Sequence, residues 1–493
     1  MKSAAGVFIQ PVHDAASAGL PQWARIAHAV RHAAASGAVR RGQRLPSARQ
    51  LALDWQVSRG AVEDAFAELQ LEGLIERRVG DGTYLSGDVV AKAAVAVPQR
   101  RAAPEAQRIL RHSLLQGCPS AQLDSARRLQ YVPPLHPRRT DLDEFPLDTW
   151  RRLMLQAHEA PQRALLDGAP CGGLPALREA IARHLAIHRG LNVLPEQVLV
   201  TGGPGEGMQL VGRLLLQPGD TMWMENPSHA SLPWLMQSMG IQVVGLPLDH
   251  QGLDVAAGRR IAPQARACYL HPLTQYPLGV RTGPTRCAEL LAWAERSGAW
   301  IVEGHMNDEM VPPAQQPPTL LARDRHGRTL MLGTFEGVAF PSLRVGYLVL
   351  PPALAAGFID AAQVYGEHVP APVQWALAEF IDRGYMTAHL QAQRKRNARR
   401  RELLRRVLLP SLPKPVRAGP LDAGMHLCLH LPPEVKDTLI AKRLRSAHVF
   451  VESLSTLAWQ DTSLNGIVLG YGGLSHAALE QGLRAIVRAL AEA

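Results

Sequence analysis

Two serines and two arginines near the N-terminus stand where short helices are expected to begin. Ser47 precedes an apolar pattern over residues 48–54, and Ser58 precedes another that runs to about residue 72. A serine at such a position caps the helix, and hydroxyls and free amide hydrogens of helix N-termini suit phosphate oxygens. Arg49 and Arg59 follow the two serines closely and have the donor geometry to reach guanine edges. The spacing therefore favours a surface that contacts phosphate.

Imine chemistry needs an amine, and amines are scarce in this chain. Its six lysines are Lys2, Lys92, Lys395, Lys414, Lys436 and Lys442, so none lies between residues 93 and 394. A strong preference for arginine accounts for part of this scarcity. A Schiff base with a carbonyl cofactor nevertheless has no lysine to form on in that long interval.

The elements that would position the two serines are compact. Residues 21–35 have helical apolar spacing, a turn follows at 42–46, and the helices over 48–54 and 59–72 come next. Residues 73–79 and 84–85 then have the pattern of two strands, which predicts a hairpin with its turn at Gly80, Gly82 and Thr83. Two short helices joined tightly and followed by a hairpin predict a winged helix-turn-helix.

The stretches "LPSARQLA", "VSRGAVEDAFAELQLEGLIE" and "RVGDGTYL" resemble the GntR family closely. In that family the recognition helix enters the major groove of DNA and the wing approaches the minor groove. The resemblance implies that the following residues face DNA: Ser47, Arg49, Ser58, Arg59 and Gly60 on the helices, and Arg78, Gly80, Gly82 and Thr83 on the wing. The alternative is a winged helix that binds protein.

After residue 140 the chain alternates helical and strand-like segments. Short apolar runs such as "QVLVTGG", "TMWMENP", "IQVVGLPL", "ACYLHP", "AWIVEGH" and "LMLGTFEG" predict an α/β fold with a mainly parallel sheet covered on both faces. The motifs "LPALREAIARHL", "YLHPLTQYPLGV" and "AGMHLCLHL" resemble fold-type I aminotransferases, which depend on pyridoxal phosphate (PLP). That resemblance implies a large PLP-dependent transferase-like domain with a smaller C-terminal α+β subdomain. Together with the N-terminal segment, about four-fifths of the chain or more is similar to MocR-type transcriptional regulators, which are usually head-to-tail homodimers.

The expected cofactor site departs from the aminotransferase pattern at several positions. Gly337 stands where the resembling "GTFSK" segment has the Schiff-base lysine. Gly304 falls on the aspartate that pairs with the pyridinium nitrogen, and Met306 falls on the tyrosine that contacts the ring hydroxyl. Without an anionic partner the ring nitrogen is not held protonated, so the cofactor cannot act as an electron sink. The resemblance therefore implies a catalytically inactive domain.

The phosphate-binding segment differs as well. Pro204 has no amide hydrogen, Gly205 has no side chain, and Glu206 would repel a dianion. His229 replaces the aromatic residue that commonly stacks on the ring. Thr274, Thr334 and Arg344 complete the expected effector pocket, and Arg344 matches either the phosphate-binding arginine of the family or a purely structural arginine.

Composition bounds the class and organisation of the protein. The chain has 493 residues and a net charge of +10, and its five cysteines are scattered without metal-ligand spacing. Together with the lack of a signal sequence or a long apolar run, this indicates a cytoplasmic protein without structural metal.

We expect a DNA-binding domain over 19–87, a basic linker over 88–140, and an aminotransferase class I/II-like domain over 141–493. Residues 91–140 carry nine basic and two acidic side chains, which suits extra attraction to phosphate. For the second basic run, over 394–406, we expect a solvated helix face.

These observations favour a DNA-binding regulator whose aminotransferase-like domain dimerises and senses a small effector without covalent PLP. A second hypothesis keeps PLP, or a PLP–amino acid adduct, bound non-covalently through Arg344. An active aminotransferase and a purely structural protein are the remaining alternatives. The sequence does not identify the effector, the operator or the regulated genes.

Overall fold

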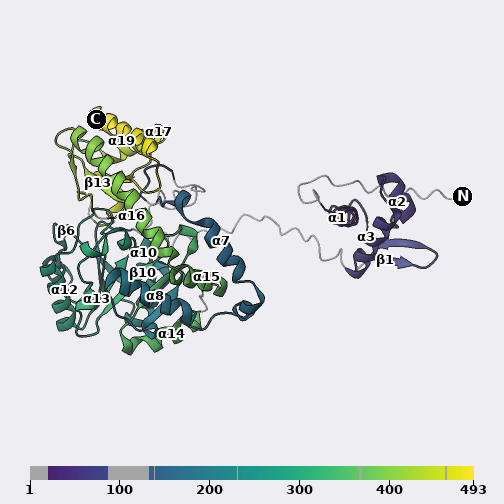
Figure 1. Cartoon of the computed structure of the whole chain (residues 1–493), viewed down its shortest axis with the longest axis horizontal. Helices are drawn as coiled ribbons and strands as arrows, with labels where there is room; N and C mark the ends of the chain where they lie inside the picture. The colour runs from purple at the N-terminus through teal and green to yellow at the C-terminus, as the bar shows by residue number, and fades with distance from the viewer. Residues whose placement is uncertain are drawn as a thin grey trace. The chain divides into compact units, whose positions relative to one another are not determined.

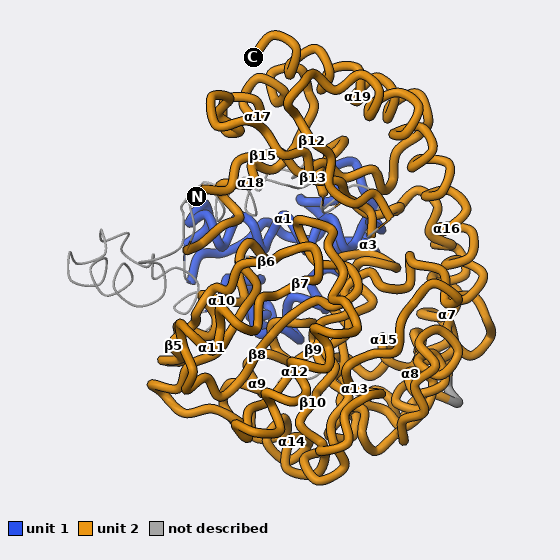
Figure 2. Tube along the Cα trace, turned by 90° about the vertical axis from the view of Figure 1, so that its left-hand side faces the viewer, with its two compact units in different colours: residues 1–107 blue, residues 108–493 orange. Residues whose placement is uncertain are grey.

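The computed structural model describes residues 20–40, 42–86, 133–137, 139–229, 231–365, 369–422, 424–460 and 463–493, apart from the side chains of residues 160 and 161. The chain divides into two compact units, residues 1–107 and 108–493, which are coloured separately in Figure 2. We refer to them as the N-terminal unit and the C-terminal unit and describe each by itself.

The N-terminal unit is a winged helix-turn-helix, as the sequence predicts. Three helices precede a two-stranded antiparallel hairpin (Figure 1): α1 (Gln22–Ala35), α2 (Ala48–Trp55), α3 (Arg59–Leu71), β1 (Ile75–Arg78) and β2 (Gly82–Leu85). The apolar side chains of the three helices form one core, in which Ile26, Val62 and Leu69 are almost completely buried. This core fixes how α2 and α3 cross, and so sets the position of both helix N-termini.

The C-terminal unit is built on a seven-stranded mixed sheet. In spatial order its strands are β3 (Val198–Thr201), β11 (Gly346–Val349), β10 (Thr329–Thr334), β9 (Trp300–His305), β8 (Ala267–Leu270), β4 (Thr221–Glu225) and β5 (Gln242–Leu246). Every pair is parallel except the two that β11 makes. The predicted mainly parallel sheet is confirmed, and the six predicted strand segments all contain strands.

Alternate residues along these strands pack against helices on opposite faces of the sheet. For example, Met222 and Met224 face one apolar cluster, whereas Trp223 faces another. The covering helices are α8 (Pro175–Arg189), α9 (Pro204–Leu215), α10 (Ser231–Ser238), α11 (Val255–Ile261), α12 (Pro284–Ser297), α14 (Pro352–Tyr365) and α15 (Ala371–Asp382). Shorter elements complete this large subdomain: η1 (Leu142–Glu144), α7 (Leu147–Gln156), η2 (Ala160–Asp167), η3 (Pro195–Gln197), β6 (Leu248–Asp249), β7 (Gly252–Leu253), η4 (Asp308–Met310), η5 (Pro313–Gln315), α13 (Leu320–Arg323) and η6 (Pro341–Leu343). Burial on both faces explains why the strands are continuous apolar runs.

The expected smaller α+β subdomain is also present. Its antiparallel sheet has the order β12 (Arg417–Ala418), β13 (His426–His430), β15 (Gly466–Gly470) and β14 (Glu452–Ser453). Its helical elements are η7 (Leu404–Leu408), η8 (Leu409–Ser411), α17 (Asp437–Ser446), α18 (Leu454–Leu457) and α19 (His476–Ala491). The long helix α16 (Tyr385–Leu403) runs from the large to the small subdomain (Figures 1 and 2). Among the described residues, no helix is both long and apolar enough to cross a bilayer.

The end of the expected linker is an integral part of the C-terminal unit. Residues 88–132 lie outside the described residues, but Leu135 is fully buried in the core of the small subdomain. Its carbonyl accepts a 2.7 Å hydrogen bond from the amide of Gly470. A side chain at Gly482 would collide with the Leu135 methyl group, so the glycine makes room for it. The linker from 88 to 140 and the domain boundaries remain predictions.

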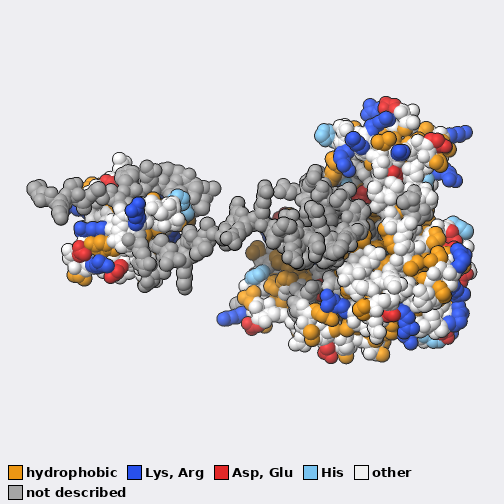
Figure 3. Space-filling view, turned by 180° about the vertical axis from the view of Figure 1, so that it is seen from behind, with side chains coloured by type: hydrophobic (Ala, Val, Ile, Leu, Met, Phe, Trp, Pro, Cys, Tyr) orange, Lys and Arg blue, Asp and Glu red, His pale blue; other side chains and the backbone are white. Residues whose placement is uncertain are grey.

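The expectation of a solvated basic face over residues 394–406 holds only in part: Lys395, Arg399, Arg405 and Arg406 are exposed, whereas Arg394, Arg396 and Arg400 are partly or fully buried. Arg400 is buried and forms hydrogen bonds of 3.2 and 3.1 Å to the two carboxylate oxygens of Asp141, which also accepts a 2.8 Å bond from Arg396. Burial alone would raise the pKa of Asp141, but the two guanidinium groups outweigh it and hold that pKa below its usual value. On the face shown in Figure 3, the remaining basic side chains of the C-terminal unit are interspersed with acidic ones. Several arginines of this run therefore tie the start of the large subdomain to α16.

Candidate functional site

The two helices expected to approach DNA begin at capped, exposed positions. The Ser47 hydroxyl accepts a 3.2 Å hydrogen bond from the amide of Gln50, and the Ser58 hydroxyl accepts a 3.1 Å bond from the amide of Ala61. Both serines, and Arg49 in the first turn of α2, are exposed. The caps confirm the predicted helix starts and leave the other first-turn amides directed outward.

Acidic residues on α3 are partly neutralised by arginines around them. Arg59 is exposed, with its Nε atom 3.9 Å from Glu63, and Glu63 also pairs with Arg77 of β1 at 2.9 Å. Gly60 has open space around the position of a Cβ atom. The first turn of α3 therefore presents Arg59 beside an unobstructed backbone.

The hairpin turn of the wing requires glycine and is stiffened by side-chain contacts. Gly80 and Gly82 have φ angles of 78° and 132°, which other residues rarely adopt. Arg78 lies over the ring of Tyr84 at 4.6 Å, and the Tyr84 hydroxyl donates a 2.9 Å hydrogen bond to Asp81. Thr83, whose carbonyl accepts a bond from Leu45, fixes the wing to the turn before α2.

Sequence reasoning missed Arg44, which the structure brings to this wing. A Cβ atom on Gly82 would lie 2.6 Å from Arg44 Nε, and Arg44 forms an antiparallel bridge with Tyr84. The sequence offered one sign of this residue: Arg44 is a basic residue directly before an apolar one, Leu45, in the turn that precedes α2. Arg44 therefore adds an exposed cation next to the predicted wing residues.

In the C-terminal unit, the space expected for a reactive side chain at position 337 is filled. A Cβ atom on Gly337 would overlap Asn307 Oδ1 and would lie 2.9 Å from the carbonyl oxygen of Met306. Asn307 Oδ1 is buried and accepts no hydrogen bond from the described residues. The Asn307 side chain thus occupies the position from which a lysine would extend.

Position 304 is closed in a similar way. A Cβ atom on Gly304 would lie 2.8 Å from both the Tyr269 hydroxyl and a ring carbon of His271. The Tyr269 hydroxyl is 2.9 Å from His271 Nε2, and His271 Nδ1 is 3.2 Å from Glu225. Burial raises the pKa of both Tyr269 and Glu225. A buried hydrogen-bonded chain therefore fills the space beside Gly304, the position that the resemblance matches to the family's aspartate.

The polar side chains that follow Gly304 form hydrogen bonds and ion pairs with their neighbours. His305 lies between Asp308 and Glu303, 3.1 Å from the latter, and the Thr274 hydroxyl donates a 2.6 Å hydrogen bond to Asp308. Burial disfavours the charged forms, but mutual attraction outweighs it, raising the pKa of His305 to about 9 and lowering that of Asp308 to about 2. Met306 packs against the apolar cluster of the sheet. Thr274 is thus buried and hydrogen-bonded, and Met306 is half-buried against that cluster.

The expected phosphate-binding site, here called the phosphate cup, is the space around Pro204, Gly205, Glu206 and Arg344. It contains two carboxylates of the chain itself. Glu336 Oε1 is 3.2 Å from the guanidinium of Arg344, and it lies 2.5 Å from where a Cβ atom of Gly203 would be. Glu206 folds back to accept a hydrogen bond from the amide of Gly202. The Thr334 hydroxyl donates to the carbonyl of Val345 and accepts from the amide of Glu336.

The remaining pocket residues contribute little that would hold a cofactor. Pro204 is the first residue of α9, and Gly205 follows it with open space around its Cβ position. His229 is exposed, with its ring centroid 5.8 Å from that of Tyr276. In the described part of the chain, no group of three or more His, Cys, Asp or Glu side chains is arranged to hold a metal ion.

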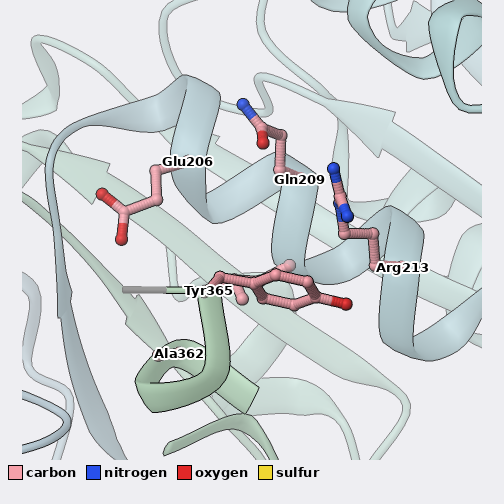
Figure 4. A pocket seen from close by; sticks show the side chains of 6 residues that line it. Glu206, Gln209, Arg213, Ala362 and Tyr365 are labelled. Carbon is pink, nitrogen blue, oxygen red and sulfur yellow. The ribbon is translucent and has the colours of Figure 1, made fainter. Parts of the chain in front are cut away.

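A surface pocket of about 180 Å³ lies beside the cup, between α9 and α14. It is lined by Glu206, Gln209, Leu210, Arg213, Ala362 and Tyr365 (Figure 4). The guanidinium of Arg213 lies 4.7 Å from the centre of the Tyr365 ring, and Figure 4 shows the Glu206 carboxylate turned away from that pair. The pocket walls are thus largely apolar or already engaged.

The residues present do not fit covalently attached PLP. Position 337 has no amine, and a Cβ atom there would collide with Asn307; Tyr269 and His271 close the space at position 304, and the Glu336 carboxylate already pairs with Arg344.

Comparison with known families divides the chain in the same places as the fold. Bacterial regulatory proteins of the gntR family match residues 22–85, and aminotransferase class I and II matches residues 140–466. Solved structures with a similar fold include an archaeal alanine:glyoxylate aminotransferase, with a TM-score of 0.68 and 23% identity over 77% of this chain and 95% of that one. The kynurenine aminotransferase of Pyrococcus horikoshii has a TM-score of 0.67 and 21% identity, covering 82% of this chain and 98% of that one. These structures establish the aminotransferase fold.

Relatives that match over nearly their whole length span both the winged helix and the aminotransferase-like domain. The chain is 29% identical to the probable rhizopine catabolism regulatory protein MocR of Rhizobium meliloti, covering 95% of this chain and 94% of that protein. It is 30% identical to the HTH-type pyridoxine biosynthesis transcriptional regulator PdxR of Corynebacterium glutamicum, covering 90% of each. Both relatives are named as regulators.

Proposed function

Because the chain belongs to the MocR-type transcriptional regulators, in which a GntR-family winged helix precedes an aminotransferase class I and II domain, we propose that it binds operator DNA and responds to a small effector without covalent PLP. In this proposal the DNA surface comprises Ser47, Arg49, Ser58, Arg59, Gly60, Arg78, Gly80, Gly82 and Thr83, with Arg44 added at the wing. The aminotransferase-like domain serves as a catalytically inactive module for homodimerisation and sensing.

One observation carries the DNA-binding part of the proposal. Ser47 and Ser58 cap two helices whose first turns are exposed, and each turn displays an arginine, Arg49 or Arg59. Capped N-termini hold a phosphate by backbone amides, which sets the register of the protein on the duplex, while arginine reads base edges.

The DNA-binding part is tested with the full-length protein and fragmented genomic DNA from its source organism. Bound fragments are sequenced, and affinity for the recovered site is measured by fluorescence anisotropy at fixed salt. We expect Arg49→Ala and Arg59→Ala each to weaken binding by about 1–3 kcal/mol, because each removes a contact to a base or phosphate. Arg443→Ala, an exposed arginine of α17, is the matched control. Unchanged affinity in the Arg49→Ala/Arg59→Ala double variant would refute the assignment.

The absence of covalent PLP is supported by Asn307, which fills the space at Gly337. The test is incubation of the purified protein with PLP, borohydride reduction and mass spectrometry. We expect no stoichiometric adduct at a single lysine, because the four lysines of the C-terminal unit, Lys395, Lys414, Lys436 and Lys442, are all exposed and would be labelled only partially. A pyridoxyl adduct with a matching absorbance band would overturn this part and would reopen the possibility of transamination.

The second candidate is a regulator that binds PLP or a PLP–amino acid adduct non-covalently. It is favoured by one observation, the 64% exposure of the Arg344 side chain. Saturable retention of PLP in equilibrium dialysis, without any reducible adduct, would distinguish it from the leading proposal.

A further inference from the structure

The expected phosphate cup of the C-terminal unit contains a carboxylate supplied by the chain. Glu336 follows β10, and its Oε1 atom lies 3.2 Å from Arg344 Nη1, while its backbone amide donates a 3.1 Å hydrogen bond to Thr334. Arg344 is held in the left-handed region, with a φ of 50°. Its guanidinium carbon is 3.6 Å from the Cβ position of Gly203, the residue that precedes α9. An anion and a cation of the same chain therefore meet at the start of α9.

The backbone at Gly203 is shaped around this carboxylate. Its φ angle is 116°, and a Cβ atom there would lie 2.5 Å from Glu336 Oε1. Only glycine adopts such a conformation readily, and only glycine leaves the space that the carboxylate oxygen fills. The start of a helix also stabilises a negative charge, which the Glu336 carboxylate supplies here.

A second carboxylate strengthens the negative character of the cup. Glu206, in the first turn of α9, accepts a hydrogen bond from the amide of Gly202. A Cβ atom on Gly202 would lie 2.8 Å from Glu206 Oε2. A phosphate dianion entering this place would meet two carboxylates and would have to displace Glu336 from Arg344. Like charges at such short separations oppose binding.

We propose that Glu336 is the residue that determines ligand specificity in this cup, by placing its own carboxylate where a phosphate group would bind. The ligand of the domain consequently carries no phosphate. This inference rests on the proposed function, in that it concerns the same effector pocket. It adds a second reason for the proposed absence of PLP. Besides the missing lysine, the Glu336 carboxylate occupies the place where the phosphate group would bind.

The test replaces Glu336 and measures the binding of inorganic phosphate to the full-length protein by equilibrium dialysis with radiolabelled phosphate. Glu336→Ser frees both space and charge, whereas Glu336→Gln keeps the shape and removes only the charge. We expect wild type to show no saturable binding and Glu336→Ser to bind phosphate roughly tenfold more tightly or better, since a helix start and an arginine become available together. Glu336→Gln should fall between them.

Two further variants identify the place of binding. Arg344→Ala introduced into Glu336→Ser should abolish the gained binding, whereas Arg213→Ala, at the neighbouring pocket lined by Tyr365, should leave it unchanged. Circular dichroism establishes that each variant is folded. If folded Glu336→Ser and Glu336→Gln both bind phosphate no better than wild type, the inference is wrong. It is equally wrong if wild type itself binds phosphate saturably at Arg344.

The outcomes separate this inference from the proposed function. A failure of Glu336→Ser to gain phosphate binding leaves DNA binding and the absence of covalent PLP untouched, since those depend on the N-terminal unit and on position 337. A covalent PLP adduct on wild type would instead refute the part of the proposed function that excludes covalent PLP, whatever the phosphate experiments show.

Discussion

At the scale of single residues, the expected cofactor site is filled as well as altered. Asn307 occupies the space next to Gly337, Tyr269 and His271 occupy the space next to Gly304, and Glu336 lies against Gly203. Each glycine therefore has a neighbour that takes its missing side-chain volume, as close packing of protein interiors requires. Restoring one family residue leaves the other obstructions in place.

Position 337 provides a direct test of this reading. We expect Gly337→Lys to be destabilised by about 1–3 kcal/mol, because the new side chain overlaps Asn307 and the carbonyl of Met306. It should also form no imine with PLP, as measured by absorbance and borohydride trapping. Gly357→Lys, on α14 with open space around its Cβ position, is the control and should unfold like wild type. An imine on Gly337→Lys would show that the obstruction yields easily.

Buried histidines should make the stability of the C-terminal unit depend on pH. Burial lowers the pKa of His305, but the attraction of Asp308 and the hydrogen bonds that the ring donates to Asp308 and Glu303 outweigh it and raise that pKa from 6.5 to about 9. The stabilisation from His305 is complete below pH 6.5 and is lost as pH rises to about 9. The pKa values of His188 and His426 are lowered to about 4, mainly by burial, so their contribution is lost as pH falls from 6.5 to about 4.

These opposite trends predict a maximum of stability near pH 6.5, measurable as the urea midpoint between pH 4 and pH 9. His305→Gln should be less stable than wild type near neutrality and should lose the decline on the alkaline side. A wild-type midpoint that rises steadily from pH 6.5 to pH 9 would contradict the assignment of a protonated His305.

At the scale of elements, local sequence patterns identified most helices and strands. The winged helix was predicted with nearly the observed boundaries because its caps and turns are local signals. The central strands were recognisable because burial on both faces makes them apolar throughout. The sequence did not indicate the role of the basic run on α16, since its partner Asp141 lies more than 250 residues away.

The cap of the recognition helix gives a prediction at this scale. Ser58→Ala removes the acceptor of the Ala61 amide and should lower the local stability of α3 by about 1 kcal/mol. Hydrogen exchange followed by mass spectrometry should show faster exchange in the first turn of α3. Ser36→Ala, at the C-terminal end of α1, is the control. Equal protection in Ser58→Ala and Ser36→Ala would indicate that the cap contributes nothing.

At the scale of the whole molecule, the proposed homodimer requires an apolar surface. Leu147 and Leu155 on α7 are each 65% exposed, whereas Trp150 and Leu153 of the same helix are buried. Exposed leucines close together on a surface favour association with another surface.

We therefore expect Leu155→Asp to shift the full-length protein towards the monomer in analytical ultracentrifugation, because a charge there would be desolvated at the interface. Leu439→Asp, at a leucine of α17 that is 61% exposed, should leave the association unchanged. A Leu155→Asp protein that associates as strongly as wild type would place the interface elsewhere.

The sequence by itself determined that the chain has a winged helix followed by a mainly parallel α/β body, and that none of its six lysines lies between residues 93 and 394. Those properties depend on local periodicity, caps and residue identity. Only the tertiary structure decided what fills the altered site, because Asn307, His271 and Glu336 reach Gly337, Gly304 and Gly203 from other segments of the chain. Such contacts arise from how the sheet brings distant residues together, which residue spacing along one segment does not express.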